Sequence, residues 1–442
     1  MTRHSMHCAV ETTTPDGVFS GIGAPRAFSR HGARRFVGAL LLLSVSATGC
    51  NVDRLLEIET PSRVAEQNYL VPQNAALIVS SSVADFECAF GAYVVVSALG
   101  AGEFVDGSQT ASRWSYDRRD VLPTDAHYST FGCAAIGVYT PISTARFTND
   151  QASTALAGWT DQQVPNRQKL IATSAALAGY SLILLGEGFC TGVLNVGPEL
   201  TSAQLFDSAI TRFTAAISAA QAANDQNLLN LAYVGRARAA RDKGDLGSAA
   251  ADAARVPADF VYNATSSTTA ARRNNRVFAQ NNSGSAVTVA PAYRNMTVGG
   301  SPDPRVPTED AGRKAGDQVN ALWWQKKYSS LSAPLPIATG IEARLILAQA
   351  RGGAEGVLIL NQLRAAAGLP LLTATEVANF GATLQEERNR WLWLQGNRWY
   401  DMRLANIPQV PAPGSPYPKG GVYGDQRCWP LPDAEKLANP NF

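Results

Sequence analysis

Residues 386–404 read EERNRWLWLQGNRWYDMRL, and this stretch decides the fold. On a helix, side chains three and four positions apart lie on one face, so its acids and arginines fall within ion-pairing reach. Gly396 interrupts the helical pattern, and a second helix is expected to begin just after it. Arginine favours bidentate pairing with carboxylates, and tryptophan supplies a large apolar anchor. We therefore expect a structural signature made of Glu387, Arg388, Trp391, Arg398, Trp399, Asp401 and Arg403.

The adjacent acids Glu386 and Glu387 allow a second interpretation, the acid and base of a glycosidase. Neighbouring residues on a helix point about 100° apart. A glycosidase needs its two carboxyl groups to flank one sugar bond, at a separation of roughly 5–9 Å. The spacing therefore favours internal ion pairing, and we predict no catalytic residue.

Helical periodicity covers most of the chain on either side of the signature. Thr201 is a favourable N-cap and Gly244 a favourable helix end. The stretch AYVGRARAARDKGDLGSAAADA (232–253) resembles one unit of a repeat of roughly 34 residues, the length of tetratricopeptide repeats. The alternative is an alanine-rich helical bundle. Helices are expected over residues 74–99, 168–185, 202–222, 228–243, 246–254, 341–351 and 356–367.

Two segments break this pattern. Residues 258–337 are rich in Pro, Gly, Asn and Ser and predict a loop-rich insertion, with short strands near 286–290 and 305–307. Residues 408–442 begin with a Pro- and Gly-rich stretch and predict an irregular cover over the helices. The helical-repeat scaffold would then comprise residues 74–257 and 338–407. All of these parts are expected to form a single domain over residues 50–442.

The N-terminal region predicts an export signal. Arg34 and Arg35 precede a short apolar run, and Thr48 and Gly49 lead into Cys50. A run of about 12 residues is too short to span a bilayer, which needs roughly 20, but it suits a cleaved signal peptide. We expect residues 1–49 to be removed and Cys50 to be lipidated. The alternatives are an ordinary signal peptide cut near Ala47 and a buried strand.

Charge and cysteine usage agree with export. Removing residues 1–49 removes five arginines and two acids, so the formal net charge falls from +2 to −1 and shows no bias towards nucleic acid. We find no second uninterrupted apolar run of about 18 residues, so membrane contact is expected through the lipid alone. Two disulfides are plausible outside the cytosol, in any of three pairings, among Cys88, Cys133, Cys190 and Cys428. His127, the one remaining histidine, is expected to be a surface or capping residue.

Several motifs, taken in order, resemble the SusD/RagB family of outer-membrane nutrient-binding lipoproteins. The family's signature helix is matched, with modest departures at Arg390, Trp391 and Gln395. SPDPRV (301–306), the Lys-Lys-Tyr segment at 326–328, the helix at 342–350, LNQLRAAAGLP (360–370) and WPLPDAEKLANPNF (429–442) resemble further family segments. The signature matches are Glu386, Glu387, Arg388, Gly396, Arg398, Trp399, Asp401 and Arg403.

The resemblance implies a mostly α fold, an α-α superhelix of tetratricopeptide-like repeats. It implies a non-catalytic, lipid-anchored protein at the outer membrane, facing the cell surface. Such a protein captures glycans or other oligomeric nutrients and delivers them to a TonB-dependent channel, with no cofactor and no metal. Two alternatives stay open: an exported hydrolase that uses carboxylates, and a helical-repeat scaffold without a small ligand.

Ligand contacts are expected in the loop SRWSYDRRD (112–120), where aromatic rings alternate with charged groups. We predict Trp114, Tyr116, Asp117 and Arg118 as contacts, and Trp324 as a second platform for a sugar ring. The alternative is that Trp114 packs over the repeats while the charges solvate the loop. For Trp324, beside Trp323, the alternative is packing in the core before the segment 326–328, and it is favoured over the platform.

Overall fold

A computed structural model describes residues 69–442, except for the side chain of Ala438. The expected signal peptide, residues 1–49, and the expected lipidation site Cys50 lie outside the described residues.

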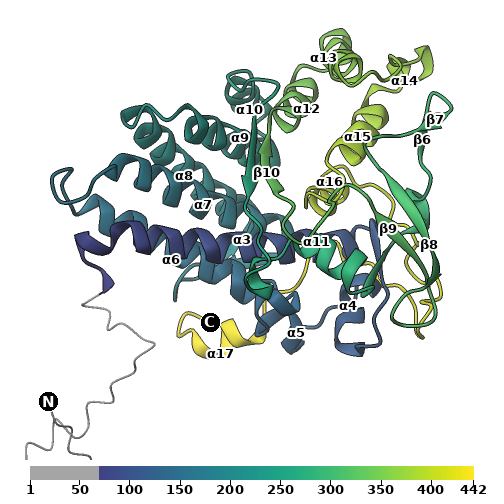
Figure 1. The fold of residues 1–442 in the computed structure, drawn as a ribbon, viewed down its shortest axis with the longest axis horizontal. Coiled ribbons are helices and arrows are strands. Elements are labelled where there is room, and N and C mark those ends of the chain that lie inside the picture. The colour runs from purple at the N-terminus through teal and green to yellow at the C-terminus, as the bar shows by residue number, and fades with distance from the viewer. Residues whose placement is uncertain (1–68) are drawn as a thin grey trace, which may run out of the picture. The chain divides into compact units, whose positions relative to one another are not determined.

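Helices dominate the described chain, and the predicted mostly α architecture is confirmed (Figure 1). Their bounds are α3 (Ala75–Gly100), α4 (Trp114–Arg118), α5 (Ala126–Ser129), α6 (Tyr139–Ala157), α7 (Arg167–Gly188), α8 (Ser202–Ala222), α9 (Gln226–Lys243), α10 (Leu246–Ala253), α11 (Arg276–Phe278), α12 (Gly340–Arg351), α13 (Gly353–Ala366), α14 (Ala374–Ala378), α15 (Phe380–Trp391), α16 (Arg398–Leu404) and α17 (Asp433–Ala438).

Local capping fixes where the repeat helices begin and end. The Thr201 hydroxyl accepts a hydrogen bond from the Gln204 backbone, and the Gln204 side chain accepts one from the Thr201 backbone, so α8 starts with a capping box. Asp225 caps α9 through the Leu228 N–H at 3.0 Å. Gly244 ends α9 in the left-handed conformation, with φ of 93°.

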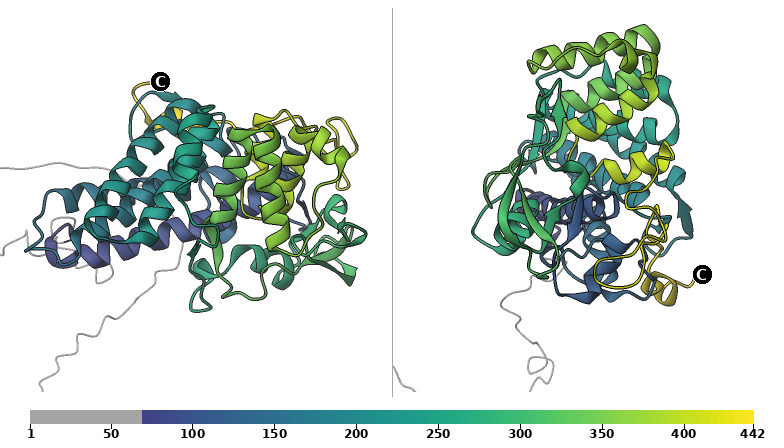
Figure 2. Two further views of the ribbon diagram at one scale, coloured as in Figure 1. Left: turned by 90° about the horizontal axis from the view of Figure 1, so that it is seen from above. Right: turned by 90° about the vertical axis from the view of Figure 1, so that its right-hand side faces the viewer.

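The helices form layers that follow chain order. Helices α6, α7, α8 and α9 each pack against the next, α10 packs on both α9 and α12, and α12 packs on α13 (Figures 1 and 2). Helix α3 lies across α6 and α7, and α16 packs on both α3 and α7. Successive helices thus build the repeat-like body that the sequence predicts.

Two helices, α3 and α7, are long and apolar enough to cross a membrane. The most apolar 18-residue stretch of each segment is mostly buried inside the protein: 78% of it in Pro72–Gly100, which contains α3, and 83% of it in α7. Both helices therefore serve as the core around which the others pack.

The strands are short, and within the described residues they form two-stranded antiparallel sheets. Their bounds are β1 (Phe104–Asp106), β2 (Thr191–Val193), β3 (Glu199–Thr201), β4 (Val261–Ala264), β5 (Val287–Val289), β6 (Thr297–Val298), β7 (Ser301–Pro302), β8 (Thr308–Lys314), β9 (Ala321–Gln325) and β10 (Leu335–Thr339).

The insertion leaves and re-enters the helical body at one place. Strand β4 pairs with β10, with Val261 opposite Thr339 and Ala264 opposite Leu335. This pairing brings the two ends of the insertion together, so that α12 can pack on α10. Strand β5 lies within the region predicted at 286–290, but residues 305–307 are not a strand. They form a turn in which Arg305 hydrogen-bonds the Asp303 carboxylate instead of a neighbouring strand.

The C-terminal segment is tied to the end of α7. Cys190 bonds to Cys428, and Trp429 forms a parallel bridge with Phe189. The Trp429 ring stacks on Trp399, with ring centroids 5.7 Å apart. Gly188 is required there because a Cβ at this position would lie 2.8 Å from the Trp429 ring. A second disulfide, Cys88–Cys133, joins α3 to the loop before α6.

Candidate functional site

The signature stretch forms α15 and α16 and is organised around the buried carboxylate of Asp401. Arg388 donates two hydrogen bonds of 2.9 Å to this carboxylate, and Arg241 on α9 donates a third. Although burial alone would raise it, the two arginines hold the pKa of Asp401 well below its usual value. The network therefore locks α9, α15 and α16 together.

Further signature residues also connect elements of the fold. Glu387 accepts hydrogen bonds from Arg305, Arg364 and the Trp391 indole, at 2.8 to 3.0 Å. Arg403 donates to the Gly186 carbonyl at 2.7 Å, at the end of α7, while Trp399 is buried against Trp429. Arg398 lies at the start of α16, and its Nε and Nη1 have no hydrogen-bond partner among the described residues.

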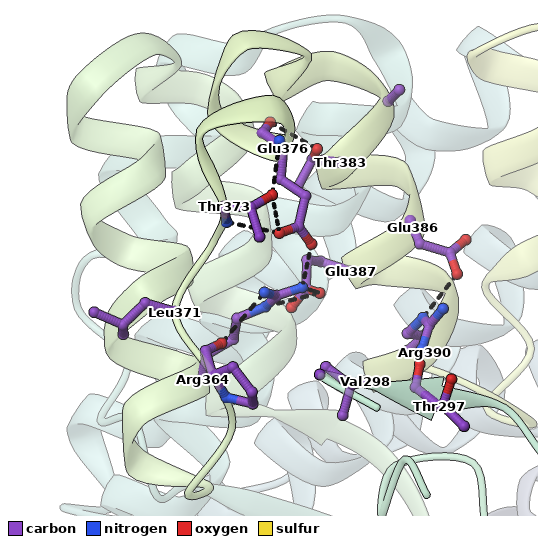
Figure 3. Close-up of a pocket in the computed structure, with 13 residues that line it drawn as sticks. Thr297, Val298, Arg364, Leu371, Thr373, Glu376, Thr383, Glu386, Glu387 and Arg390 are labelled. Atoms are coloured by element: carbon purple, nitrogen blue, oxygen red, sulfur yellow. Dashed lines mark hydrogen bonds and ion pairs between the residues drawn. The ribbon is translucent and has the colours of Figure 1, made fainter. Parts of the chain in front are cut away.

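A cavity of about 400 Å³ opens beside the signature, and we call it the signature cavity (Figure 3). Glu387 reaches Arg364, whereas Glu386 turns to Arg390 and forms a separate pair at 2.7 Å. Glu376 is held by Thr373 and Arg364. Because these charges are already paired, the cavity offers no free acid for catalysis. It is lined by Thr297, Val298, Gly299, Arg364, Pro370, Leu371, Thr373, Glu376, Ala382, Thr383, Glu386, Glu387 and Arg390.

A second cavity, of about 460 Å³, lies where the C-terminal cover meets the insertion and the end of α3, and we call it the cover cavity. Its volume falls within the range of small-ligand sites, roughly 300–1,000 Å³. Its walls are mainly proline, aliphatic and aromatic, with a few polar groups. It is lined by Leu99, Gly102, Phe104, Val105, Asp117, Arg119, Ala290, Pro291, Ala292, Arg294, Val319, Asn320, Ala321, Val410, Pro411, Pro416, Pro418 and Tyr423.

The cover is fixed over this cavity by close backbone packing. Gly102 has φ of 70°, and a Cβ there would lie 2.5 Å from the Val410 carbonyl oxygen. Val121 and Gln426 exchange two hydrogen bonds of 2.8 Å between the Val121 backbone and the Gln426 amide. The Gly424 N–H donates to the Arg118 carbonyl at 2.7 Å. The cover is therefore an ordered wall of the cavity.

The polar groups of the cavity come from three distant segments. Asp117 accepts hydrogen bonds from the Asp106 N–H at 2.9 Å and the Tyr417 hydroxyl at 3.2 Å. Burial, with Asp106 nearby, raises the pKa of Asp117 to about 7. Arg119 donates to the Pro411 carbonyl at 2.6 Å, and its guanidinium lies 4.9 Å from the centre of the Tyr423 ring.

Lys419 clamps the cover onto the loop that carries Trp114. Its ammonium donates to the Asp106 carbonyl oxygen and carboxylate and to the Ser108 carbonyl, at 2.6 to 3.1 Å. It also lies 4.9 Å from the centre of the Trp114 ring, within cation–π range. The Trp114 indole donates to the Ser108 carbonyl at 3.0 Å. Lys419 therefore occupies one face of the Trp114 ring, which was predicted as a platform for a sugar.

The structure separates the predicted contacts into three places. Tyr116 lies in the core, 1% exposed, with its ring 6.1 Å from Trp429, so it does not reach a ligand. Asp117 lines the cover cavity, whereas Trp114 and Arg118 are half-buried and are not among its lining residues. Arg118 pairs with Asp120 at 2.5 Å. Trp324 is half-buried on β9 and is not among the residues that line the cavity.

The structure also corrects the prediction for His127 and adds residues to the candidate sites. His127 is not a surface residue: it packs against Phe131, with ring centroids 4.7 Å apart, and burial lowers its pKa to about 4. Arg294 lines the cover cavity although no sequence motif marks it, and so does Tyr423, a minor candidate for a sugar platform in the sequence. Phe147, 48% exposed on α6, lies in an open hollow of about 520 Å³ with Asp150 and Arg212. Among residues 69–442, no group of three or more His, Cys, Asp or Glu could hold a metal ion.

Comparison with solved structures identifies the fold. A SusD-like carbohydrate-binding protein from Bacteroides vulgatus aligns with a TM-score of 0.63 at 14% identity, over 84% of this chain and 97% of the other. Surface glycan-binding protein A from Bacteroides thetaiotaomicron, in complex with laminarihexaose, aligns with a TM-score of 0.63 at 14% identity, over 84% and 98%. A SusD/RagB family protein from the same organism aligns with a TM-score of 0.57 at 12% identity, over 83% and 94%. No protein-family model matches the sequence, and no curated protein matches it either.

Proposed function

We propose that this protein, which has the SusD-like fold, is a non-catalytic binding protein that captures glycans or other oligomeric nutrients. The observation that carries the proposal is the cover cavity, where apolar walls and a few polar groups converge in a volume suited to a small ligand. The laminarihexaose complex of a protein with the same fold supports a glycan as the ligand. Sugar rings have apolar faces and hydroxyl edges, which suits such a lining.

The chemistry of the acidic residues favours binding over hydrolysis. Glu387, a buried acid of the signature, has both carboxylate oxygens engaged by arginines. Glu386 is held by Arg390 in a different pair. A hydrolase needs two carboxyl groups free to act across one sugar bond, and the paired acids of the signature do not meet this need.

We propose that the lipid on Cys50 anchors the protein to the outer membrane, facing the cell surface, and that a TonB-dependent channel receives the captured nutrient. A tether keeps the binding body at high effective concentration over its partner. Removal of the lipid should then reduce uptake without weakening the binding of the free glycan.

The test measures binding and turnover together. The full chain, extracted in detergent, is titrated calorimetrically with a panel of soluble oligosaccharides, and each mixture is then examined for new reducing ends. Saturable binding without product supports the proposal. Product formation would favour the exported hydrolase, and absence of any binding would favour the scaffold without a small ligand.

A matched pair of aromatic variants locates the bound sugar. Tyr423→Ala removes a ring from the cover cavity, whereas Phe147→Ala removes an exposed ring on α6. Because aromatic contacts contribute about 0.5–1.5 kcal/mol, Tyr423→Ala should weaken binding by about two- to twelvefold and Phe147→Ala should leave it unchanged. The reverse result would move the site to the α6 hollow. Purification of a large β-barrel protein with the wild-type chain would support the channel partner.

A further inference from the structure

The cover cavity carries an excess of positive charge. Three charged side chains line it: the arginines Arg119 and Arg294 and one acid, Asp117. Burial favours the uncharged form of Asp117, so this acid neutralises the arginines only partly near neutral pH. A pocket with this balance attracts a negatively charged group.

Arg119 has unused hydrogen-bonding capacity. It caps the end of α4 with φ of 59°, and its side chain is almost fully buried. One terminal nitrogen donates to the Pro411 carbonyl, but Nε has no partner among the described residues. A buried donor without a partner is unfavourable, and a bound acceptor that reaches the guanidinium can offset this cost.

Arg294 presents the second guanidinium. Its Nε donates to the Val289 carbonyl at 2.9 Å, and the group lies 5.4 Å from the centre of the Trp323 ring. These contacts hold the side chain in place while both terminal nitrogens have no hydrogen bond to residues 69–442. The acid that acts on it, Asp310 on β8, caps the Gly312 N–H with one oxygen at 2.9 Å.

A positioned arginine with free terminal nitrogens can donate two parallel hydrogen bonds to two oxygens of one anionic group, whether a planar carboxylate or a tetrahedral oxyanion. Arg294 is positioned by its Nε bond and by the Trp323 face, and Arg119 by Pro411 and Tyr423. Apolar walls from Pro291, Pro411 and Val319 would accept a ring face between them. We infer that the cover cavity binds an anionic oligosaccharide, with a carboxylate or sulfate of one sugar held by Arg119 and Arg294. This inference rests on the proposed glycan-binding function and narrows its ligand class.

The test compares ligands that differ only in charge. The full chain in detergent is titrated with an oligogalacturonate, with the same oligomer after reduction of its carboxyl groups, and with a sulfated galactan oligosaccharide. We expect the reduced oligomer to bind at least about tenfold more weakly than an anionic one, and anionic binding to weaken as salt is raised. Preference for the galacturonate or for the sulfated sugar decides the source of the negative charge.

Variants assign the effect to the cavity. Arg294→Gln should weaken binding of the anionic oligomers by about 10- to 100-fold. Arg294→Lys keeps the charge but loses the bidentate guanidinium, so its affinity should lie between those of the wild type and Arg294→Gln. Arg272→Gln, at an exposed pair with Asp85, removes the same charge elsewhere and should have no effect. Circular dichroism confirms that each variant is folded.

The outcomes separate this inference from the proposed function. Equal binding of neutral and anionic oligomers, unchanged by Arg294→Gln, would overturn the anionic ligand while leaving glycan capture intact. Binding of no oligosaccharide would overturn both.

Discussion

The signature pair Arg388–Asp401 should be worth several kilocalories per mole, and Asp401→Asn tests this. The carboxylate receives both bonds from Arg388 at 2.9 Å and a further bond from Arg241, and the three side chains are at most 2% exposed. Asparagine keeps the shape but leaves the buried Arg388 guanidinium without this counter-charge, while Arg241 keeps only its pair with Asp242 at 2.8 Å. Breaking a buried pair in this way typically costs about 3–5 kcal/mol. Since native proteins are stable by only about 5–15 kcal/mol, a large share of the total should be lost.

The assay is chemical denaturation followed by tryptophan fluorescence, at pH 7 and at about pH 3, which is below the unfolded pKa of an aspartate. Asp207→Asn is the control, because its pair with Lys243 is exposed and should cost about 1 kcal/mol or less. A group whose pKa is depressed stabilises the fold above its unfolded pKa, near 4, and loses that effect as the pH falls. The difference between wild type and Asp401→Asn should therefore shrink in acid. A cost below about 1 kcal/mol at pH 7, or equal to that of Asp207→Asn, would refute the reasoning.

Three further predictions concern the packing around the candidate site. Burial raises the pKa of Glu103 to about 7, so this group should lower wild-type stability as the pH rises through 5 to 7. Glu103→Gln should reduce this slope, to which Asp117 also contributes, and should add about 3 kcal/mol at pH 8. An unchanged slope in denaturation curves would contradict the prediction. Replacing both Cys190 and Cys428 by alanine should lower the free energy of unfolding by about 2–5 kcal/mol in the same assay, because the disulfide closes a loop of 238 residues. Unchanged stability of the double variant would contradict this prediction. Gly102→Ala should speed amide hydrogen exchange in residues 408–423, because its Cβ would clash with the Val410 carbonyl oxygen. Gly300 also has positive φ but lies in open space, so Gly300→Ala should not change exchange in these residues. Equal exchange rates in the two variants would show that the clash is absent.

Local sequence signals predicted the parts of the fold that local forces determine. Helix α8 begins where Thr201 predicted it, and α9 ends at Gly244 as expected, because caps act within one turn. Helical spacing predicted internal ion pairing in the signature, and Glu386 pairs with Arg390 four positions further on. The pairing of Arg388 with Asp401 spans 13 residues and two helices, so spacing did not specify it. Their third partner, Arg241, could not be inferred either, since it lies 160 residues away and only the packed helices bring it near.

Helix α6 was missed for a related reason. Residues 139–157 alternate Thr, Ser, Asn and Ala, and their apolar face is weak. Packing against α3 and α7 stabilises this helix, as tertiary contacts do for most helices. The turn at residues 305–307 was mistaken for a strand because the pairing of Arg305 with Asp303 has no periodic pattern.

The site was predicted only in part because it is assembled from three remote segments. Asp117 was named from its loop, but Arg294 and Tyr423 lie in the insertion and the cover, about 180 and 300 residues further along. Tyr116 was expected at the surface, yet Trp429 returns over it from the C-terminal segment. Burial in irregular segments depends on contacts with residues that are remote in the sequence, and hydrophobic periodicity does not predict such contacts.

The central claim is that the cover cavity is where a sugar binds, and crystals of the protein grown with an oligogalacturonate or sulfated galactan oligosaccharide test it most directly. We predict sugar density in the cover cavity, with an acidic group within hydrogen-bonding distance of Arg119 and Arg294. Sugar density in the signature cavity or beside Phe147, with the cover cavity empty, would contradict the account.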